Sequence, residues 1–323
     1  MTPAARGARS GNRVTALRWA LLLRQLGHRP FVAERWDGRP AAALLALHAR
    51  KSAPSVRAWV ERHGSRATAV LLAGTDIYPR FDLDADLLAC LCAAHVLVAL
   101  QPEALDLLPP ELRAKTRVVL QSARATWAER PKDTLQACVL ANLRAVKDPL
   151  LPFRAAALVP PALSLQVKLA GQPLDPDLEA AAAATDARDR RCRWLGPLSR
   201  RRALALLAQS HVCIVPSLGE GGANVVSEAI AAGSPVLASA IPGNTGILGQ
   251  DWPGLFPPGD AAALAALLTR LCAEPAFLAD LRRRTQRLLP LVEPRAERAA
   301  LQALLADLGV AAARPAGDDL DGA

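Results

Sequence analysis

The stretch from His211 to Gly246, HVCIVPSLGEGGANVVSEAIAAGSPVLASAIPGNTG, constrains the fold of this chain more than any other. The apolar run 212–215 predicts a buried strand. The glycine-rich loop 219–222 allows another molecule to approach the backbone closely. A helix is expected over 223–232, followed by a second buried strand over 236–239. The order strand, loop, helix, strand is typical of a parallel α/β sheet.

The loop and the helix after it predict a site for a nucleotide-sugar. A glycine-rich loop that leads into a helix N-terminus presents backbone N–H groups and the positive end of the helix dipole to an anion. Glu220 and Glu228 frame the loop. Carboxylates repel phosphate but accept hydrogen bonds from hydroxyls. Amides for a phosphate and carboxylates for sugar diols together favour a nucleotide-sugar, and the alternative is an ordinary strand–helix–strand unit with surface glutamates.

The segment PSLGEGGANVVSEAIAAGSPVLAS is similar to the donor-binding signature of retaining-type glycosyltransferases with the GT-B fold. The resemblance implies an α/β protein with two Rossmann-like, doubly wound parallel-sheet domains that face a cleft. It implies that Glu220 contacts the donor sugar, with a catalytic role, and that Glu228 holds the nucleotide ribose. Further donor contacts are implied for the loop between them: Gly221, Gly222, Ala223 and Asn224.

A second donor element is expected after the strand 137–141, in the segment NLRAVKDP. In the resembled family the corresponding loop carries an arginine and a lysine that neutralise the donor diphosphate. Lys147 takes the place of the lysine, which implies both binding and catalysis. Asn142 occupies the position of the arginine, and Arg144 is shifted from it. The diphosphate clamp therefore carries over for Lys147, with Arg144 as a substitute cation.

The N-terminal half also alternates apolar strands with helices, which predicts another parallel sheet. Ligands of such sheets bind beyond the carboxyl ends of the strands. His48 and Asp76 follow two of these strands, and we expect them to orient the acceptor or the sugar, with catalytic roles. A structural role is the alternative for a lone histidine. The candidate acceptor-binding residues come from the same loops and from the start of the first helix: Gly11, Asn12, Arg13, Arg50, Lys51 and Thr75.

The expected domain organisation has one irregularity at its start. Residues 1–10 contain no apolar strand ahead of the first helix, so the N-terminal sheet is expected to lack its first strand, unless the start codon is assigned too late. We expect an acceptor domain over 1–125, a linker over 126–134, a UDP-sugar-binding domain over 135–310 and a disordered tail over 311–323.

Composition narrows the class of partner. The net charge of +9 favours anionic ligands, but the arginine clusters lack the interleaved aromatics of nucleic-acid binders, so nucleic acid is not expected. The six cysteines lack zinc-site spacing and predict buried, reduced thiols of a cytoplasmic protein. Asp82, Asp84 and Asp86 are expected to cap a helix, so we expect no metal and no cofactor. No apolar run is long enough for a membrane helix, and no stable membrane association is expected.

Several further stretches narrow the resemblance: GNRVTALRWA, LALHARKSA, AGTDIY, ALQPEAL, QSA, NLRAVKDP and LASAIPGNTGILG. Together with EGGANVVSEA they resemble the selenosugar synthases of selenoneine biosynthesis, which are GT-B enzymes similar to glycosyltransferase family 4. The resemblance implies transfer of the sugar of UDP-GlcNAc or UDP-glucose to selenophosphate. The products would be UDP and, ultimately, a 1-selenosugar. It also implies that the chain functions beside a selenophosphate synthetase.

Three other functions remain open at this point. A conventional GT-B glycosyltransferase acting on a lipid or glycan would share the donor half. A UDP-sugar epimerase would need carboxylates in the N-terminal half, where Asp76 is the obvious one. A non-enzymatic UDP-sugar sensor would bind the donor without turnover.

Overall fold

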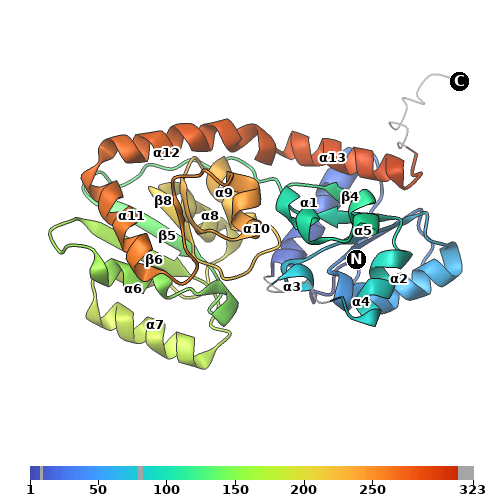
Figure 1. Cartoon of the computed structure of the whole chain (residues 1–323), viewed down its shortest axis with the longest axis horizontal. Coiled ribbons are helices and arrows are strands. Elements are labelled where there is room, and N and C mark those ends of the chain that lie inside the picture. The colour runs from blue at the N-terminus through green and yellow to red at the C-terminus, as the bar shows by residue number, and fades with distance from the viewer. Residues whose placement is uncertain (8–9, 79–82, 312–323) are drawn as a thin grey trace, which may run out of the picture. The chain divides into compact units, whose positions relative to one another are not determined.

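The computed structural model describes residues 1–7, 10–78 and 83–311, and the chain divides into two compact units (Figure 1). Unit 1 comprises Met1–Gln121 together with Pro294–Ala323, and unit 2 comprises Ser122–Glu293. Both units contain a parallel sheet flanked by helices, which confirms the expected α/β fold with a parallel sheet in each of two domains.

Unit 1 is built on a parallel sheet with the strand order β1-β2-β3-β4. Its strands are β1 (Leu44–Leu47), β2 (Thr68–Leu71), β3 (Val96–Ala99) and β4 (Thr116–Val118). The central strands read TAVL and VLVA and are buried throughout. Such continuously apolar strands form where helices cover both faces of a parallel sheet.

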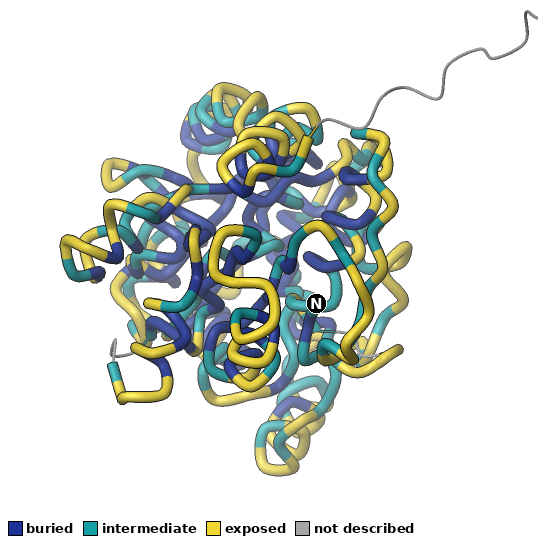
Figure 2. The backbone as a smooth tube through the Cα atoms, turned by 90° about the vertical axis from the view of Figure 1, so that its right-hand side faces the viewer, coloured by how far each residue is buried: buried dark blue, intermediate teal, exposed yellow. Residues whose placement is uncertain are grey.

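Helices cover the two faces of this sheet in two groups. One core cluster joins the sheet to α2 (Ala49–His63) and α4 (Ala85–Ala93) around Trp59. The other joins it to α1 (Gly11–Gln25) and α13 (Pro294–Asp307). In Figure 2 the buried segments are dark blue and the outer turns of the helices are yellow, as expected of amphipathic helices. Short helices complete the unit: α3 (Gly74–Ile77), η1 (Pro102–Leu107) and α5 (Pro110–Ala114).

Unit 2 has a parallel sheet with the strand order β10-β9-β8-β5-β6-β7. Its strands are β5 (Leu135–Leu140), β6 (Leu165–Ala170), β7 (Cys192–Trp194), β8 (Val212–Val215), β9 (Val236–Ser239) and β10 (Leu255–Phe256). The chain first moves outward from β5 to β7, and then returns to build β8, β9 and β10 on the other side of β5. The direction of winding therefore reverses between β5 and β8.

The helices of unit 2 follow this winding. The list is η2 (Ala145–Lys147), α6 (Leu151–Leu158), α7 (Pro176–Arg188), α8 (Arg200–Gln209), α9 (Asn224–Ala231), α10 (Pro242–Leu248), α11 (Ala261–Ala273), α12 (Pro275–Leu288) and η3 (Leu289–Val292). Helices α6 and α11 pack against each other, and α9 contacts α8 and α12. The expected strand–loop–helix–strand unit corresponds to β8, α9 and β9.

The domain boundaries differ from the expected ones at both ends of unit 2. The segment expected as a linker contains Arg130, whose guanidinium donates to the carbonyls of Ser210, Ala232 and Gly233 and so belongs to unit 2. At the other end, α13 packs on unit 1 rather than on the unit that precedes it in the chain. From residue 312 onward, the expected tail lies outside the described residues.

A buried carboxylate fixes α13 to α1. Glu297 Oε2 lies 2.8 Å from Arg18 Nε, and Glu297 Oε1 accepts a 2.8 Å hydrogen bond from Trp19 Nε1. The Glu297 side chain is fully buried, whereas that of Arg18 remains 14% exposed. Removing a charge from such a pair leaves the other charge uncompensated, which is destabilising.

Where the sequence analysis expects the first strand to be missing, Met1 and Thr2 form hydrogen bonds to the segments on either side of them. The α-amino group of Met1 donates to Leu45 O at 2.7 Å, and Leu47 N donates to Met1 O at 3.0 Å. Thr2 N donates to Ala33 O at 2.9 Å. Alternate residues thus bond to opposite neighbours, as in a strand with a partner on each side.

We predict that Glu297→Gln lowers the free energy of unfolding of unit 1 by ~2–4 kcal/mol, because Arg18 loses its carboxylate in a buried setting. Urea denaturation measures the change. Asp307→Asn on the same helix is the matched control. Its partner Arg117 is half exposed, so the loss there should not exceed ~1 kcal/mol. Equal losses in the two variants would contradict the assigned role of Glu297.

We also predict that stability rises as the pH increases from 6 to 8. Burial lowers the pKa of the Met1 amino group from 8.0 to about 6. Between these values the unfolded chain binds a proton that the folded chain does not, so unfolding is favoured toward the lower pH. The gain across this window is roughly 2–3 kcal/mol. Denaturation of the free and the N-terminally acetylated protein measures it, and the acetylated protein should lack this increment.

Candidate functional site

The reversal of winding in unit 2 lies between β5 and β8, and a loop follows each of these strands. In open parallel sheets, ligands bind beyond the carboxyl ends of the strands where the winding reverses. Here those ends belong to β5 and β8, which pair directly. The segment 142–147 follows β5 and the segment 216–224 follows β8. Both donor elements expected from the sequence therefore lie at this position.

An ion pair joins the two loops. Lys147 Nζ contacts Glu220 Oε1, and the same oxygen accepts a 2.7 Å hydrogen bond from Ser217 Oγ. The backbones also meet, because Leu218 N donates to Val146 O at 2.9 Å. Both charged side chains keep some exposure, 28% for Lys147 and 12% for Glu220. The ammonium and the carboxylate are thus held together but remain reachable from solvent.

The loop after β9 supports Glu220 through a close approach at Gly243. A Cβ atom built on Gly243 would lie 2.2 Å from Glu220 O and 2.6 Å from Glu220 Cβ. Only glycine fits this position. Asn244 is buried and donates to Ser239 O at 3.0 Å, and the Ser239 hydroxyl donates to Ser217 O. The segment IPGN therefore packs against the loop that carries Glu220 and supports it.

The second glutamate lies on α9 and is paired with a residue that sequence analysis did not single out. Glu228 Oε1 lies 2.8 Å from Arg200 Nη1 at the start of α8. The Glu228 side chain is 11% exposed and that of Arg200 is 53% exposed. The carboxylate is thus fixed in orientation by a cation on its solvent side. The N-cap residue of α9 is Ala223, which offers no side-chain acceptor to the first helical amides.

Three residues were expected to bind the donor diphosphate: Asn142, Arg144 and Lys147. Of these three, Lys147 is the one that contacts Glu220. Asn142 Oδ1 accepts a 3.0 Å hydrogen bond from Gln172 N, which ties the loop after β5 to the loop after β6. Gly171 permits this contact, because a Cβ there would lie 1.8 Å from Ala141 O. Arg144 is exposed at the start of η2. Asn142 therefore has a structural partner, and Arg144 remains a solvent-facing cation.

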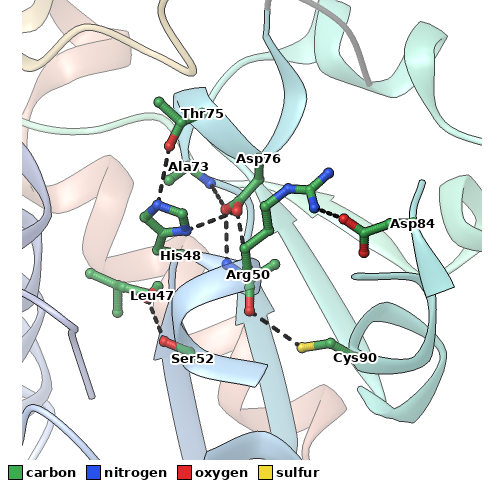
Figure 3. A network of polar contacts seen from close by, with 10 residues as sticks. Leu47, His48, Arg50, Ser52, Ala73, Thr75, Asp76, Asp84 and Cys90 are labelled. Atoms are coloured by element: carbon green, nitrogen blue, oxygen red, sulfur yellow. Dashed lines mark hydrogen bonds and ion pairs between the residues drawn. The ribbon is translucent and has the colours of Figure 1, made fainter. Parts of the chain in front are cut away.

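In unit 1 the residues expected to orient a substrate form a network centred on Asp76 (Figure 3). Asp76 Oδ2 accepts 2.8 Å hydrogen bonds from the amides of Ala49 and Ala73, and Oδ1 accepts a 3.1 Å bond from the amide of Arg50. His48 Nδ1 lies 2.8 Å from Asp76 Oδ1, within ion-pair distance but without hydrogen-bond alignment. Asp76 is 1% exposed. Its carboxylate therefore joins the loops after β1 and β2 and caps the start of α2.

His48 connects this buried carboxylate to an exposed hydroxyl. His48 Nε2 lies 3.1 Å from Thr75 Oγ1, and Thr75 is exposed while His48 is buried. His48 also has a φ of +72°, a conformation that is uncommon for a non-glycine residue. Strained residues of this kind concentrate at functional sites. The sequence pattern HARKSA did not reveal the strain.

The candidate acceptor cations have different surroundings. Arg50 Nη1 pairs with Asp84, which caps α4 through a 2.7 Å bond from Leu87 N. The capping role expected for Asp84 is confirmed, whereas Asp82 lies outside the described residues. Lys51 is exposed on α2.

The other acceptor candidates begin α1. Gly11, Asn12 and Arg13 form its first turn, and Ser10 Oγ accepts a 3.4 Å bond from Arg13 N. The helix start is thus already capped by a side chain.

Among residues 1–7, 10–78 and 83–311, no group of three or more His, Cys, Asp and Glu side chains could hold a metal ion. All cysteines are free, and burial raises the pKa of the Cys90 and Cys192 thiols to about 12, which keeps them protonated. The expectation of burial is wrong for Cys92, which is exposed.

One bent pair of helices meets a test of length and composition for a membrane span. In the described part of the chain no single helix has the length and apolar character to cross a membrane, and only Ala261–Ala273 with Pro275–Asp307, bent by 104°, passes that test jointly.

Residues 136–274 match a family model described as glycosyl transferases group 1. No curated protein sequence matches the chain. The matched region spans β5 to α11 and so contains Lys147, Glu220 and Glu228.

Solved structures similar to this chain share its fold at low sequence identity. Sucrose-phosphate synthase from Thermosynechococcus elongatus has a TM-score of 0.67 at 20% identity, over 83% of this chain and 74% of that one. Anabaena HepE in complex with UDP has a TM-score of 0.68 at 14% identity, over 91% and 83%. Trehalose-6-phosphate synthase OtsA has a TM-score of 0.66 at 15% identity, over 91% and 81%. The chain thus has the GT-B fold, and its residues 136–274 match the glycosyl transferases group 1 model.

Proposed function

We propose that the chain is a glycosyltransferase that uses a UDP-sugar as donor. The observation that carries the proposal is the contact between Lys147 and Glu220 across the β5–β8 switch point, with Glu228 on the helix that follows. Anabaena HepE, which has the same fold, is known in complexes with UDP and with UDP-glucose.

Each donor-site group suits one part of a UDP-sugar. The ammonium of Lys147 would bind the diphosphate, and the carboxylate of Glu220 would accept hydrogen bonds from sugar hydroxyls. Amides at the start of α9 would add positive potential at the phosphates. Glu228, held by Arg200, would accept hydrogen bonds from the ribose diol. These groups supply the charge that leaving-group departure needs, so we propose a reaction without a metal.

We further propose that the acceptor is selenophosphate. The support is the resemblance of GNRVTALRWA, HARKSA and IPGN to selenosugar synthases. The selenium atom would attack C1 of the sugar, the bond from C1 to the diphosphate oxygen would break, and UDP would leave with the electron pair. Later cleavage of the phosphorus–selenium bond by water would give the 1-selenosugar. A selenium nucleophile is ionised at neutral pH, so catalysis would consist mainly of positioning and leaving-group stabilisation.

In this scheme the network of unit 1 has a positioning role. The exposed hydroxyl of Thr75 contacts His48, and His48 in turn contacts Asp76. Arg50 and Lys51 lie in the first turn of α2, beside this network, and would attract an anionic acceptor. Asp76 is already bonded to three amides, so its role is to hold the loops rather than to exchange a proton.

We predict that Glu228→Gln weakens UDP binding by roughly 10–100-fold, because the neutral amide is a weaker acceptor for ribose hydroxyls and leaves Arg200 without its carboxylate. Isothermal titration calorimetry with UDP measures the change. Glu274→Gln, which alters an exposed pair with Arg270 in the same unit, should leave the affinity unchanged. Equal affinities of all three proteins for UDP would reject the donor site.

We predict that Lys147→Ala lowers kcat/KM for the donor by roughly 10²–10³-fold, since it removes a cation at the position of developing charge on UDP. Steady-state release of UDP measures the loss. The exposed Lys132 provides the control, and Lys132→Ala should retain full activity. Unchanged turnover in Lys147→Ala would place the diphosphate elsewhere.

The acceptor is tested by mass spectrometry after incubation with UDP-GlcNAc or UDP-glucose and freshly prepared selenophosphate. A selenosugar formed together with UDP supports the narrow proposal. Transfer only to lipid or glycan acceptors would overturn it in favour of a conventional glycosyltransferase. Tight UDP-sugar binding without turnover of any acceptor would instead indicate a sensor.

A further inference from the structure

Arg130 lies at the edge of the unit 2 sheet that is opposite the candidate donor site. It precedes β5, and its Nε donates a 2.8 Å hydrogen bond to the carbonyl of Ser210, just ahead of β8. The donor loops follow the other ends of these two strands. The four residues of β8 separate the two edges by roughly 13 Å. A site at Arg130 is therefore distinct from the donor site.

Backbone carbonyls fix the guanidinium of Arg130 in one orientation. Its Nη2 donates to Ala232 O at 3.0 Å, to Gly233 O at 3.1 Å and to Ser234 Oγ at 3.2 Å. The carbonyls lie at the C-terminal ends of α8 and α9, where the helix dipoles favour a cation. The remaining nitrogen, Nη1, donates to no acceptor in the described part of the chain. Two N–H donors of a well-held guanidinium are thus unused.

Arg282 on α12 adds a second guanidinium beside the first. Helix α12 packs against α9, whose C-terminal end Arg130 holds. Burial, and then the charge of Arg282, lower the pKa of Arg130. Burial and the charges of Arg282 and Arg130 also lower the pKa of His211, the residue that follows Ser210. The two arginines therefore lie close enough to repel each other.

Arg282 has no partner for its charge. Its Nε is buried without a hydrogen bond, and burial lowers the pKa of its guanidinium. Among the residues that the structure describes, no carboxylate pairs with Arg282 or with Arg130. Glu129 is next to Arg130 in the sequence, but it is exposed and pairs with neither arginine.

Such a pair of cations is unfavourable unless an anion joins it. Like charges repel, and a cation that is partly removed from water needs an acceptor or an opposite charge. The two helix ends supply this for Arg130, but no described residue supplies it for Arg282. A ligand with two negative charges and several acceptor oxygens matches two planar guanidiniums. Phosphate has this form, whereas one carboxylate would neutralise only one of the arginines.

We propose that Arg130 and Arg282 form a binding site for a phosphate dianion, either free or as the phosphoryl group of a small metabolite. Arg282 would donate to it from its Nη atoms and Arg130 from Nη1. The site lies entirely within unit 2. It goes beyond the proposed glycosyl transfer, in which neither arginine takes part.

The first test is the melting temperature of the protein saturated with UDP, in inorganic phosphate and in sodium chloride of equal ionic strength. Because UDP fills the donor site, any specific effect of phosphate arises elsewhere. We expect phosphate to raise the melting temperature by roughly 3–6 °C. Arg282→Gln should lose most of this rise. Arg287→Gln, which removes the same charge from an exposed position of α12, should keep it. The general stabilising effect of phosphate is common to all three proteins.

The second test is the affinity for phosphate, measured by titration followed by phosphorus NMR with UDP present. Arg282→Gln should weaken binding at least about tenfold. If that variant folds poorly, Arg282→Lys keeps the charge without the planar fork and should still weaken binding severalfold. Titration with glycerol 3-phosphate distinguishes the source. Tighter binding of the ester indicates a phosphorylated metabolite, and tighter binding of inorganic phosphate indicates the free ion.

Two outcomes would overturn the proposal. One is the same rise in melting temperature and the same phosphate affinity in the unchanged protein, Arg282→Gln and Arg287→Gln. The other is a phosphate effect that disappears once UDP is bound, since this would place the phosphate in the donor site.

Discussion

The reversal of strand order between β5 and β8 is the constraint on which the candidate donor site depends. In a parallel sheet, adjacent loops usually lie over the same helix layer. Where the winding reverses, the two loops diverge and leave room for a ligand at the carboxyl edge. In this chain a lysine from one of these loops contacts a glutamate from the other. The loop after β9 then holds the glutamate through the glycine at 243, where no side chain fits.

Unit 1 depends on buried carboxylates in a different way. Asp76 accepts three backbone hydrogen bonds and fixes two loops at the carboxyl ends of β1 and β2. Glu297 fixes α13, which follows unit 2 in the chain, to α1. The chain therefore returns to unit 1 after completing unit 2. A charge that is costly to bury is stable in both places because each of its oxygens has a donor.

Sequence patterns predicted the repeated parts of this fold well. The apolar runs over 212–215 and 236–239 coincide with β8 and β9, since a strand covered on both faces is apolar without interruption. The pairing of Lys147 with Glu220 could not be predicted, because it depends on the order of strands in the sheet, and local residue patterns do not encode that order.

Long-range packing also escaped prediction. The assignment of α13 to unit 1 rests on contacts between residues 279 positions apart, Arg18 and Glu297. Arg200 gave no signal because the run of arginines at 200–202 resembles a solvated helix face, and only the fold brings Arg200 to Glu228. The strain at His48 is likewise a property of the backbone, which the residue type alone does not reveal.

Hydrogen exchange measured by mass spectrometry with and without saturating UDP tests the central claim most directly. The account predicts slower exchange in residues 142–147 and 217–232, which carry the loops after β5 and β8 and the helix α9. Exchange in β1, β2 and α2 should not change when UDP binds without an acceptor. Protection confined to unit 1, or none anywhere at saturating UDP, would contradict the placement of the donor site.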